Sequence, residues 1–108
     1  MMCKLQYSPE AVRDLDEIET YIAEELSNPE AASRIISCIL DAADRLESFP
    51  ELGALLSSIT SVQSDYRFIP VESYLVFYRV LTQEVYVDRI LYGRRDYMRI
   101  LFSLPSSE

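Results

Sequence analysis

Arginine and tyrosine residues are concentrated in the last third of this chain, where their chemistry suits an anion or a partner protein. Two β-rich runs, Tyr74–Val80 and Val85–Leu91, lead directly into the sequence Tyr92-Gly-Arg-Arg-Asp-Tyr-Met-Arg99. Arginine is always charged, and its planar guanidinium donates hydrogen bonds in a geometry that suits phosphate or carboxylate. We therefore predict an anion-facing or partner-facing site at the end of the last strand. The alternative is that these side chains are solvated surface charges.

The composition limits the chemistry of such a site. The chain contains no histidine, so it cannot build a Ser-His-Asp or Cys-His nucleophile system. Its two cysteines, Cys3 and Cys38, are far apart in the sequence, which argues against a structural zinc site and, in a reducing compartment, against a disulfide. The only glycines are Gly53 and Gly93, too few for a glycine-rich phosphate loop. We predict no metal and no cofactor, so acid–base catalysis would have to come from Asp, Glu, Tyr or Lys.

Charge is distributed unevenly along the chain. The net charge is −8, of which residues 1–50 carry −7 and residues 51–108 carry −1. A negative field opposes long-range attraction to nucleic acid, although a local positive cleft can survive on an acidic protein. With 108 residues, 49% of them apolar, we expect one globular domain over residues 1–108. No apolar run is long enough to span a membrane and no signal peptide is visible, so we expect a cytoplasmic protein.

Two helices are predicted in the first half of the chain. Ser8-Pro9-Glu10 supplies an N-cap, a first-turn proline and an acid near the positive end of the helix dipole. Asn28-Pro29 repeats the signal for a second helix that ends near Phe49-Pro50. The short link makes the pair an antiparallel hairpin. The periodicity of the first helix predicts that its apolar residues form one stripe and that its acids face solvent. The stripe comprises Val12, Leu15, Ile18, Ile22 and Leu26, with Tyr21 beside it. The acids are Asp14, Asp16, Glu17, Glu24 and Glu25.

The remaining pattern predicts strands, and the fold class is therefore α+β. The expected strands are Leu5–Tyr7, Tyr66–Ile69 ending at Pro70, Tyr74–Val80 and Val85–Leu91, the last three forming an antiparallel meander. Residues 54–64 are expected to form a connector folded against the sheet, and residues 103–108 a frayed tail. Alternation along Tyr74–Val80 predicts one face in the core and a partly exposed aromatic face. Arg79 and Arg89 interrupt these strands and have candidate partners within the fold in Glu72, Asp88 and Asp96.

Several motifs in this order resemble the RelE/ParE superfamily of type II toxin–antitoxin toxins. They are Tyr7-Ser-Pro-Glu-Ala11, Phe49-Pro-Glu-Leu-Gly53, Tyr66-Arg67, Ser73–Arg79 and Arg89-Ile-Leu-Tyr-Gly-Arg-Arg-Asp96. The resemblance covers nearly the whole chain. It implies an N-terminal helical hairpin packed on a small antiparallel sheet, followed by a short C-terminal helix or tail.

One branch of that superfamily, similar to RelE, implies an endoribonuclease that cleaves mRNA on the ribosome. Such chemistry needs basic groups that stabilise the charge of the phosphorane and a group that protonates the leaving oxygen. The resemblance assigns these roles to Arg67, Arg95 and, as the nearest phenol, Tyr97. Leu75 and Ile69 stand where RelE-like toxins carry further basic residues. Where their terminal tyrosine would fall, the chain has Leu101 and Phe102.

The other branch, similar to ParE, implies growth inhibition by poisoning DNA gyrase, without a catalytic group. The acidic chain, the long hairpin and Gly93-Arg-Arg-Asp96 favour this branch. The resemblance also implies a cognate antitoxin, whose helix and extended segment place apolar side chains beside the sheet and carboxylates on its basic end. It leaves open a homodimer or a heterotetramer with the antitoxin. The residues expected to contact target or antitoxin are Arg67, Arg79, Arg94, Arg95, Tyr97 and Arg99. A third interpretation is a non-toxic interaction module with an aromatic surface at Tyr74, Tyr78 and Tyr86.

Overall fold

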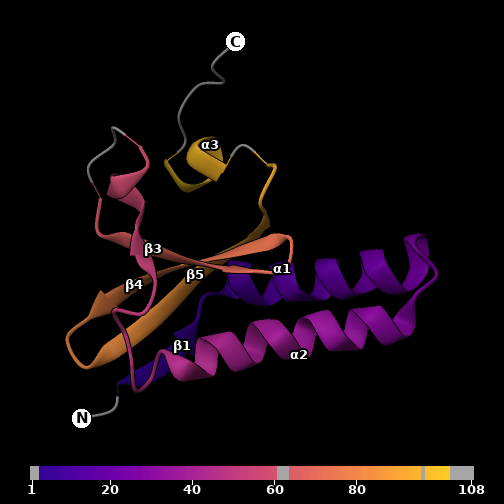
Figure 1. Ribbon diagram of the computed structural model, residues 1–108, viewed down its shortest axis with the longest axis horizontal. Helices are drawn as coiled ribbons and strands as arrows, with labels where there is room; N and C mark the ends of the chain where they lie inside the picture. The colour runs from indigo at the N-terminus through magenta and orange to yellow at the C-terminus, as the bar shows by residue number, and fades with distance from the viewer. Residues whose placement is uncertain (1–2, 61–63, 96, 103–108) are drawn as a thin grey trace.

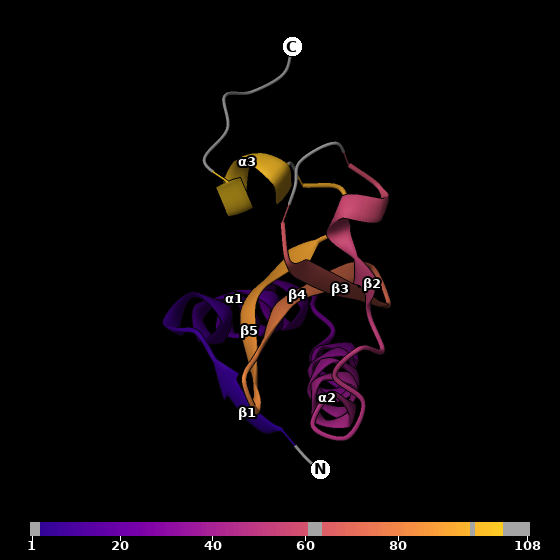
Figure 2. The same cartoon turned by 90° about the vertical axis from the view of Figure 1, so that its left-hand side faces the viewer.

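A computed structural model describes residues 3–60, 64–95 and 97–102. It shows a sheet with a helical hairpin on one face and a short helix on the other (Figures 1 and 2). The predicted tail, residues 103–108, and part of the predicted connector, residues 61–63, lie outside the described residues.

The sheet contains five strands in the order β1-β5-β4-β3-β2. The strands are β1 (Lys4–Tyr7), β2 (Ala54–Leu55), β3 (Tyr66–Val71), β4 (Tyr74–Leu81) and β5 (Glu84–Tyr92). The predicted α+β class and the meander β3-β4-β5 are confirmed. Because β1 pairs with β5 in parallel, the sheet is mixed rather than wholly antiparallel. Strand β3 also continues through Pro70, where the sequence predicted that it would end. On its outer side, β2 pairs only with Arg67 and Phe68, so no neighbouring strand needs the N–H that Pro70 lacks.

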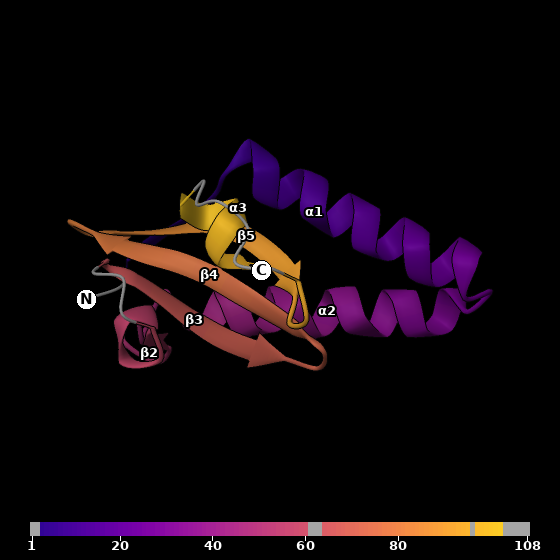
Figure 3. The same cartoon turned by 90° about the horizontal axis from the view of Figure 1, so that it is seen from above.

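The predicted caps begin both long helices. Ser8 Oγ accepts the Ala11 N–H at 2.9 Å at the start of α1 (Pro9–Thr20), and Asn28 Oδ1 accepts the Ala31 N–H at 3.1 Å at the start of α2 (Pro29–Arg45). The two helices form the expected hairpin, whose closed end extends beyond the sheet (Figure 3). A five-residue π-helical segment, η1 (Tyr21–Glu25), follows α1 directly, and Ser27 then adopts a left-handed conformation with φ 51°.

Three residues of α1 and its extension depart from the predicted stripe. Asp14, expected in solvent, is 6% exposed, whereas Val12 and Leu26, expected in the core, are both 56% exposed. Ala11 takes the inward position next to Val12. The physical reasons are that the edge of β5 supplies Asp14 with hydrogen-bond donors and that the wider turn of η1 changes the helical phase before Leu26.

Strand β4 is covered on both faces. Val76 and Tyr78 face the hairpin in the main core, while Phe77 and Leu91 are buried on the opposite face. That second face is covered by a 3-10 turn, η2 (Leu56–Ser58), and by the short helix α3 (Tyr97–Phe102) (Figure 2). The prediction of a partly exposed aromatic face on β4 is therefore wrong, because Val76 and Tyr78 of that face are buried and only its two ends, Tyr74 and Val80, are partly exposed.

No helix in the described part of the chain is both long and apolar enough to cross a bilayer. Cys3 and Cys38 are free thiols. Among the same residues, no three side chains of His, Cys, Asp or Glu are grouped so that they could hold a metal ion.

Candidate functional site

The predicted arginine pair, Arg94 and Arg95, lies in a tight turn directly after β5. The Gly93 N–H donates to the Ser73 carbonyl at 2.9 Å, and the Arg95 N–H donates to the Tyr92 carbonyl at 2.9 Å. A Cβ at position 93 would lie 3.4 Å from the same Ser73 oxygen, so the close approach of the two backbones favours glycine there. Both arginine side chains are exposed, and neither forms an ion pair with any described residue. The turn therefore presents two exposed cations that have no ion-pair partner within residues 3–60, 64–95 and 97–102.

Arg67 and Arg79 lie toward the opposite end of the meander. Their partners across the strands are Tyr78 and Tyr66, whereas the turn of Arg94 and Arg95 follows the pairing of Tyr74 with Tyr92. Four residues along β4 separate Tyr74 from Tyr78, which corresponds to roughly 13 Å. The predicted arginines are therefore not gathered at one strand end, because the meander places them at both of its ends.

Both of these distant arginines already have partners. Arg79 Nε lies 3.2 Å from Asp65, with its guanidinium 5.7 Å from the centre of the Tyr66 ring, and the bond to Asp65 raises the pKa of Arg79. Arg67 donates to the Gly53 carbonyl at 2.8 Å, next to the buried Tyr78 hydroxyl, which accepts from the Gly53 N–H and donates to the Pro50 carbonyl. Arg67 and Tyr78 thus hold the Phe49–Gly53 loop in place.

The phenol and the last arginine of the predicted site belong to α3. The Tyr97 ring packs on Phe77 with ring centres 5.2 Å apart, as part of the cover over the sheet, while Arg99 lies on an exposed position of the helix. Arg67, Arg95 and Tyr97, the set expected for an RNase, therefore lie in three different surroundings: the Phe49–Gly53 loop, the turn after β5 and the α3 cover.

A second tyrosine lies near Arg79. The Tyr66 hydroxyl donates to the Asp88 carboxylate, and the Tyr66 ring packs edge-on against Phe102 of α3. Burial, followed by this bond to Asp88, raises the pKa of Tyr66. The phenol consequently stays protonated at neutral pH and acts as a hydrogen-bond donor rather than as a base.

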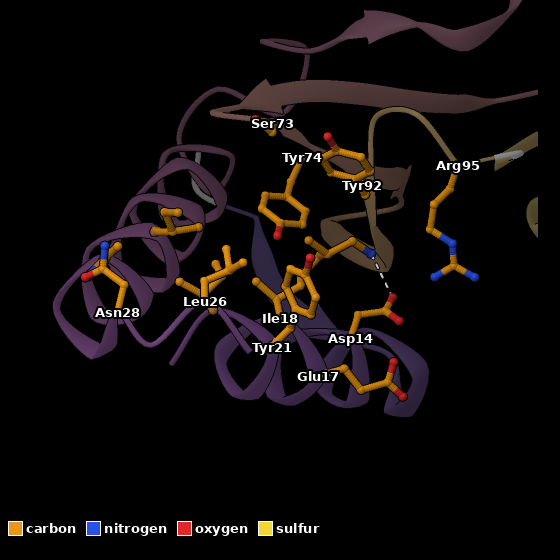
Figure 4. A pocket seen from close by; sticks show the side chains of 14 residues that line it. Asp14, Glu17, Ile18, Tyr21, Leu26, Asn28, Ser73, Tyr74, Tyr92 and Arg95 are labelled. Carbon is orange, nitrogen blue, oxygen red and sulfur yellow. Dashed lines mark hydrogen bonds between the residues drawn. The ribbon is translucent and has the colours of Figure 1, made fainter. Parts of the chain in front are cut away.

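A groove of about 580 Å³ opens beside Arg95, between the closed end of the hairpin and the ends of β4 and β5 (Figure 4). We call it the tyrosine groove, because the rings of Tyr21, Tyr74 and Tyr92 face it. Tyr21 is 52% exposed, Leu26 56% and Tyr92 41%. The Tyr74 and Tyr92 rings pack edge to face with centres 5.7 Å apart. The remaining lining residues are Asp14, Glu17, Ile18, Ile22, Asn28, Ala31, Ile35, Ser73 and Ile90.

One end of the tyrosine groove is charged. Figure 4 shows the Arg95 guanidinium on the side of the groove where the Asp14 and Glu17 carboxylates lie. Leu26 and the polar Asn28 line the other end (Figure 4). Between the two ends, burial, followed by the neighbouring phenols of Tyr21 and Tyr92, raises the pKa of Tyr74. The groove is therefore lined largely by aromatic and aliphatic side chains, with the Arg95 guanidinium and the Asp14 and Glu17 carboxylates at one end.

Asp14 fixes this wall of the groove. Strand β1 pairs with β5 only as far as Val87, and beyond that point α1 takes its place along the edge. There Asp14 Oδ2 accepts the Ile90 N–H at 2.9 Å, and its two oxygens accept from the Arg89 guanidinium at 2.8 and 2.9 Å. The bond to Asp14 raises the pKa of Arg89. Of the candidate partners for Arg79 and Arg89, Glu72 and Asp88 form no ion pair with either arginine in the described part of the chain, and Glu72 pairs with Arg34 instead. Asp96, the third candidate, lies outside the described residues.

The sequence placed Arg94 and Arg95 at the end of the last strand, where the structure has them, but it did not indicate the groove. Leu26 was assigned to the apolar stripe of a regular helix and Tyr21 to a position beside it, whereas both side chains are exposed where the helix becomes π-helical and ends. The run of acidic residues in the first helix did not indicate that Asp14 is buried. Asp14 bonds Arg89 and Ile90, and its sequence context is the same as that of the exposed acids around it. Three tyrosines from three separate elements could be brought together only by the fold.

The comparisons with known proteins agree with this geometry. The family model of the ParE toxin of the type II toxin–antitoxin system, parDE, matches residues 5–97. The chain is similar to the chromosomal ParDE TA system from P. aeruginosa, with 25% identity, a TM-score of 0.71 and coverage of 84% of this chain and 96% of that chain. It also resembles the toxin–antitoxin complex RelBE2 from Mycobacterium tuberculosis, with 16% identity, a TM-score of 0.63 and coverage of 85% and 99%, which shows the shared fold. Curated proteins gave no match. Because the family model spans most of the chain, the protein belongs to the ParE toxin family of type II toxin–antitoxin systems.

Proposed function

We propose that this protein inhibits cell growth by binding DNA gyrase, and that a cognate antitoxin neutralises it by occupying the tyrosine groove. Membership of the ParE toxin family supports a toxin with an antitoxin partner. The similarity to a ParDE TA system supports the same pairing. The tyrosine groove carries the proposal for the antitoxin, and the turn of Arg94 and Arg95 carries the proposal for the target.

The groove has the chemistry of a site for an amphipathic protein segment. Its exposed apolar side chains, Tyr21, Leu26 and Tyr92, leave apolar surface in water that a partner can bury. Arg95 at the mouth would pair with a carboxylate of the same segment. An acidic antitoxin segment with apolar side chains at helical spacing meets both requirements.

Substitution of Leu26 by aspartate tests the antitoxin site. A carboxylate in the apolar part of the groove would lose its water when the antitoxin binds, so we expect the affinity for the antitoxin to fall by about 30-fold or more. Isothermal titration calorimetry measures the change. In cells, the Leu26→Asp toxin should arrest growth even when the antitoxin is present.

Val12→Asp is the matched control. Val12 lies in α1 and, like Leu26, is an aliphatic residue with 56% exposure, but it does not line the groove. This variant should bind the antitoxin as the wild type does. Equal loss of affinity in both variants would mean that the added charge acts at long range, and full affinity in Leu26→Asp would place the antitoxin elsewhere.

For the target, the exposed turn offers binding groups rather than a catalytic assembly. Arg94 and Arg95 are accessible and unpaired among the described residues. The residues that an RNase would need, Arg67 and Tyr97, are respectively bonded to the Gly53 carbonyl and packed on Phe77. Inhibition by binding requires no proton transfer and no activated nucleophile.

One preparation of the protein distinguishes the target classes. We expect it to inhibit gyrase supercoiling, to leave ribosome-bound mRNA intact, and to lose its effect when the antitoxin is added. Cleaved mRNA with unaffected gyrase would instead assign the RelE-like activity. The absence of any growth effect in cells without antitoxin would assign a non-toxic interaction module.

A further inference from the structure

The charged end of the tyrosine groove carries both signs of charge. Its charged side chains are Arg95, in the turn after β5, and Asp14 and Glu17, both in α1 (Figure 4). Asp14 and Glu17 are three residues apart, so they lie on neighbouring turns of the same helix face. Which of these charges a partner meets depends on which of them the fold already neutralises.

Asp14 is neutralised within the fold. Its two oxygens accept hydrogen bonds from the Arg89 guanidinium at 2.8 and 2.9 Å, and one of them also accepts the Ile90 N–H at 2.9 Å. Only 6% of the residue is exposed. Because both oxygens are occupied and little of their surface is in water, Asp14 shapes the groove wall and offers a partner no available carboxylate.

Glu17 differs from Asp14 in both respects. It is exposed on α1, and no ion pair joins it to Arg95 or to any other residue within 3–60, 64–95 and 97–102. Arg95 is likewise exposed and without an ion-pair partner in the same ranges. Among the described lining residues, the groove thus presents one available cation and one available anion that do not pair with each other.

An unmatched carboxylate at this position opposes the binding of a wholly acidic segment. When a partner covers the groove, Glu17 loses part of its water, and a negative charge facing it adds repulsion. The net charge of the chain, −8, acts in the same direction. A basic side chain of the partner next to Glu17 removes the local repulsion and replaces the lost water with a hydrogen-bond donor.

We propose that Glu17 is a specificity residue of the tyrosine groove, which selects a protein segment that carries a lysine or arginine for Glu17 as well as an acid for Arg95. The inference rests on the proposed function, because it specifies the charges of the antitoxin segment that occupies the groove. Leu26 and Asn28 at the other end carry no charge, so the two charged contacts also fix the direction in which the segment lies.

The sign of the change in affinity tests this proposal. At roughly 50 mM salt, Glu17→Gln should weaken binding of the antitoxin about 3-fold, and Glu17→Lys about 10-fold or more, because lysine replaces attraction by repulsion. The probe is the full-length protein encoded by the reading frame next to that of the toxin, and isothermal titration calorimetry measures its affinity. Each toxin variant is first checked by circular dichroism.

Glu19→Gln and Glu19→Lys are the matched controls. Glu19 is an exposed acid of the same helix, and it does not line the groove. These variants only make the chain less negative, so they should bind an acidic antitoxin at least as tightly as the wild type does. Weakening by the Glu17 variants alone would therefore report a direct contact rather than the net charge.

A charge exchange across the interface gives a second readout, which a loss of structure would not produce. Replacing one lysine or arginine of the antitoxin with glutamate should restore most of the affinity that Glu17→Lys loses. Unchanged or tighter binding of Glu17→Gln, or the lack of any restoring antitoxin variant, would overturn the proposal.

The Leu26→Asp toxin distinguishes this failure from that of the proposed function. If Leu26→Asp binds weakly while Glu17→Gln binds normally, the antitoxin occupies the groove without a basic residue for Glu17. If neither variant weakens binding, the antitoxin binds elsewhere and both proposals are wrong.

Discussion

Alanine at both Arg94 and Arg95 is expected to abolish growth arrest while the protein stays folded. The two guanidiniums are exposed and unpaired among the described residues, so they contribute binding energy only when a partner supplies anionic groups. Removing two charge-assisted contacts should weaken binding to gyrase by about 100-fold or more. Growth curves without antitoxin, together with a supercoiling assay on the purified variant, measure the effect.

The fold should survive these substitutions because backbone groups hold the turn. The bonds from Gly93 to Ser73 and from Arg95 to Tyr92 use main-chain atoms alone. Arg13→Ala combined with Arg45→Ala is the matched control, since both residues are exposed arginines of the helical hairpin and the net charge changes equally. That control should remain toxic. Full toxicity of the Arg94 and Arg95 variant would remove the turn from the target site.

Among substitutions of the acidic residues of α1, we expect Asp14→Ala to lower the free energy of unfolding the most. The substitution leaves the Ile90 N–H without its acceptor and the Arg89 guanidinium without its counter-ion. Breaking a buried ion pair on one side costs about 3–5 kcal/mol. Because the Arg89 side chain is 23% exposed and can regain some water, we expect a value near the lower limit, about 3 kcal/mol. Urea unfolding followed by circular dichroism measures the change.

Asp16→Ala removes the same charge from the same helix at an exposed position. It should change the free energy of unfolding by no more than about 0.5 kcal/mol. If the two variants were equally stable, the Asp14 bonds to β5 would contribute nothing to folding. In that case the edge of β5 would have to be supported by packing alone.

Local signals predicted much of the fold. Ser8-Pro9 and Asn28-Pro29 each combine a side-chain cap with a proline that fits the first helical turn, and both helices begin there. Alternating β-branched and aromatic residues likewise predicted the meander. These features depend on neighbours in the sequence, which is why they can be read without a structure.

The features that sequence reasoning missed depend on tertiary contacts. Asp14 is buried because β1 ends before β5 does, and nothing near Asp14 in the sequence records that difference in length. Arg67 was predicted to face a partner, yet it bonds the Gly53 carbonyl, which only strand pairing brings near. Of the candidate site, the turn of Arg94 and Arg95 was predicted from the order of strand and charge, whereas the tyrosine groove required the folded chain.

The π-helical segment Tyr21–Glu25 makes the shape of the tyrosine groove depend on the number of residues in the helix as well as on their identity. A π-helical turn contains about one residue more than an α-helical turn, so a one-residue deletion that restored the α-helix would leave the residues after it at nearly the same angle around the helix axis. Such a deletion would narrow the turn that begins at Tyr21 and keep Leu26 on the same side of the helix. The extra residue therefore widens the groove wall at Tyr21 without reorienting the chain that leads into α2.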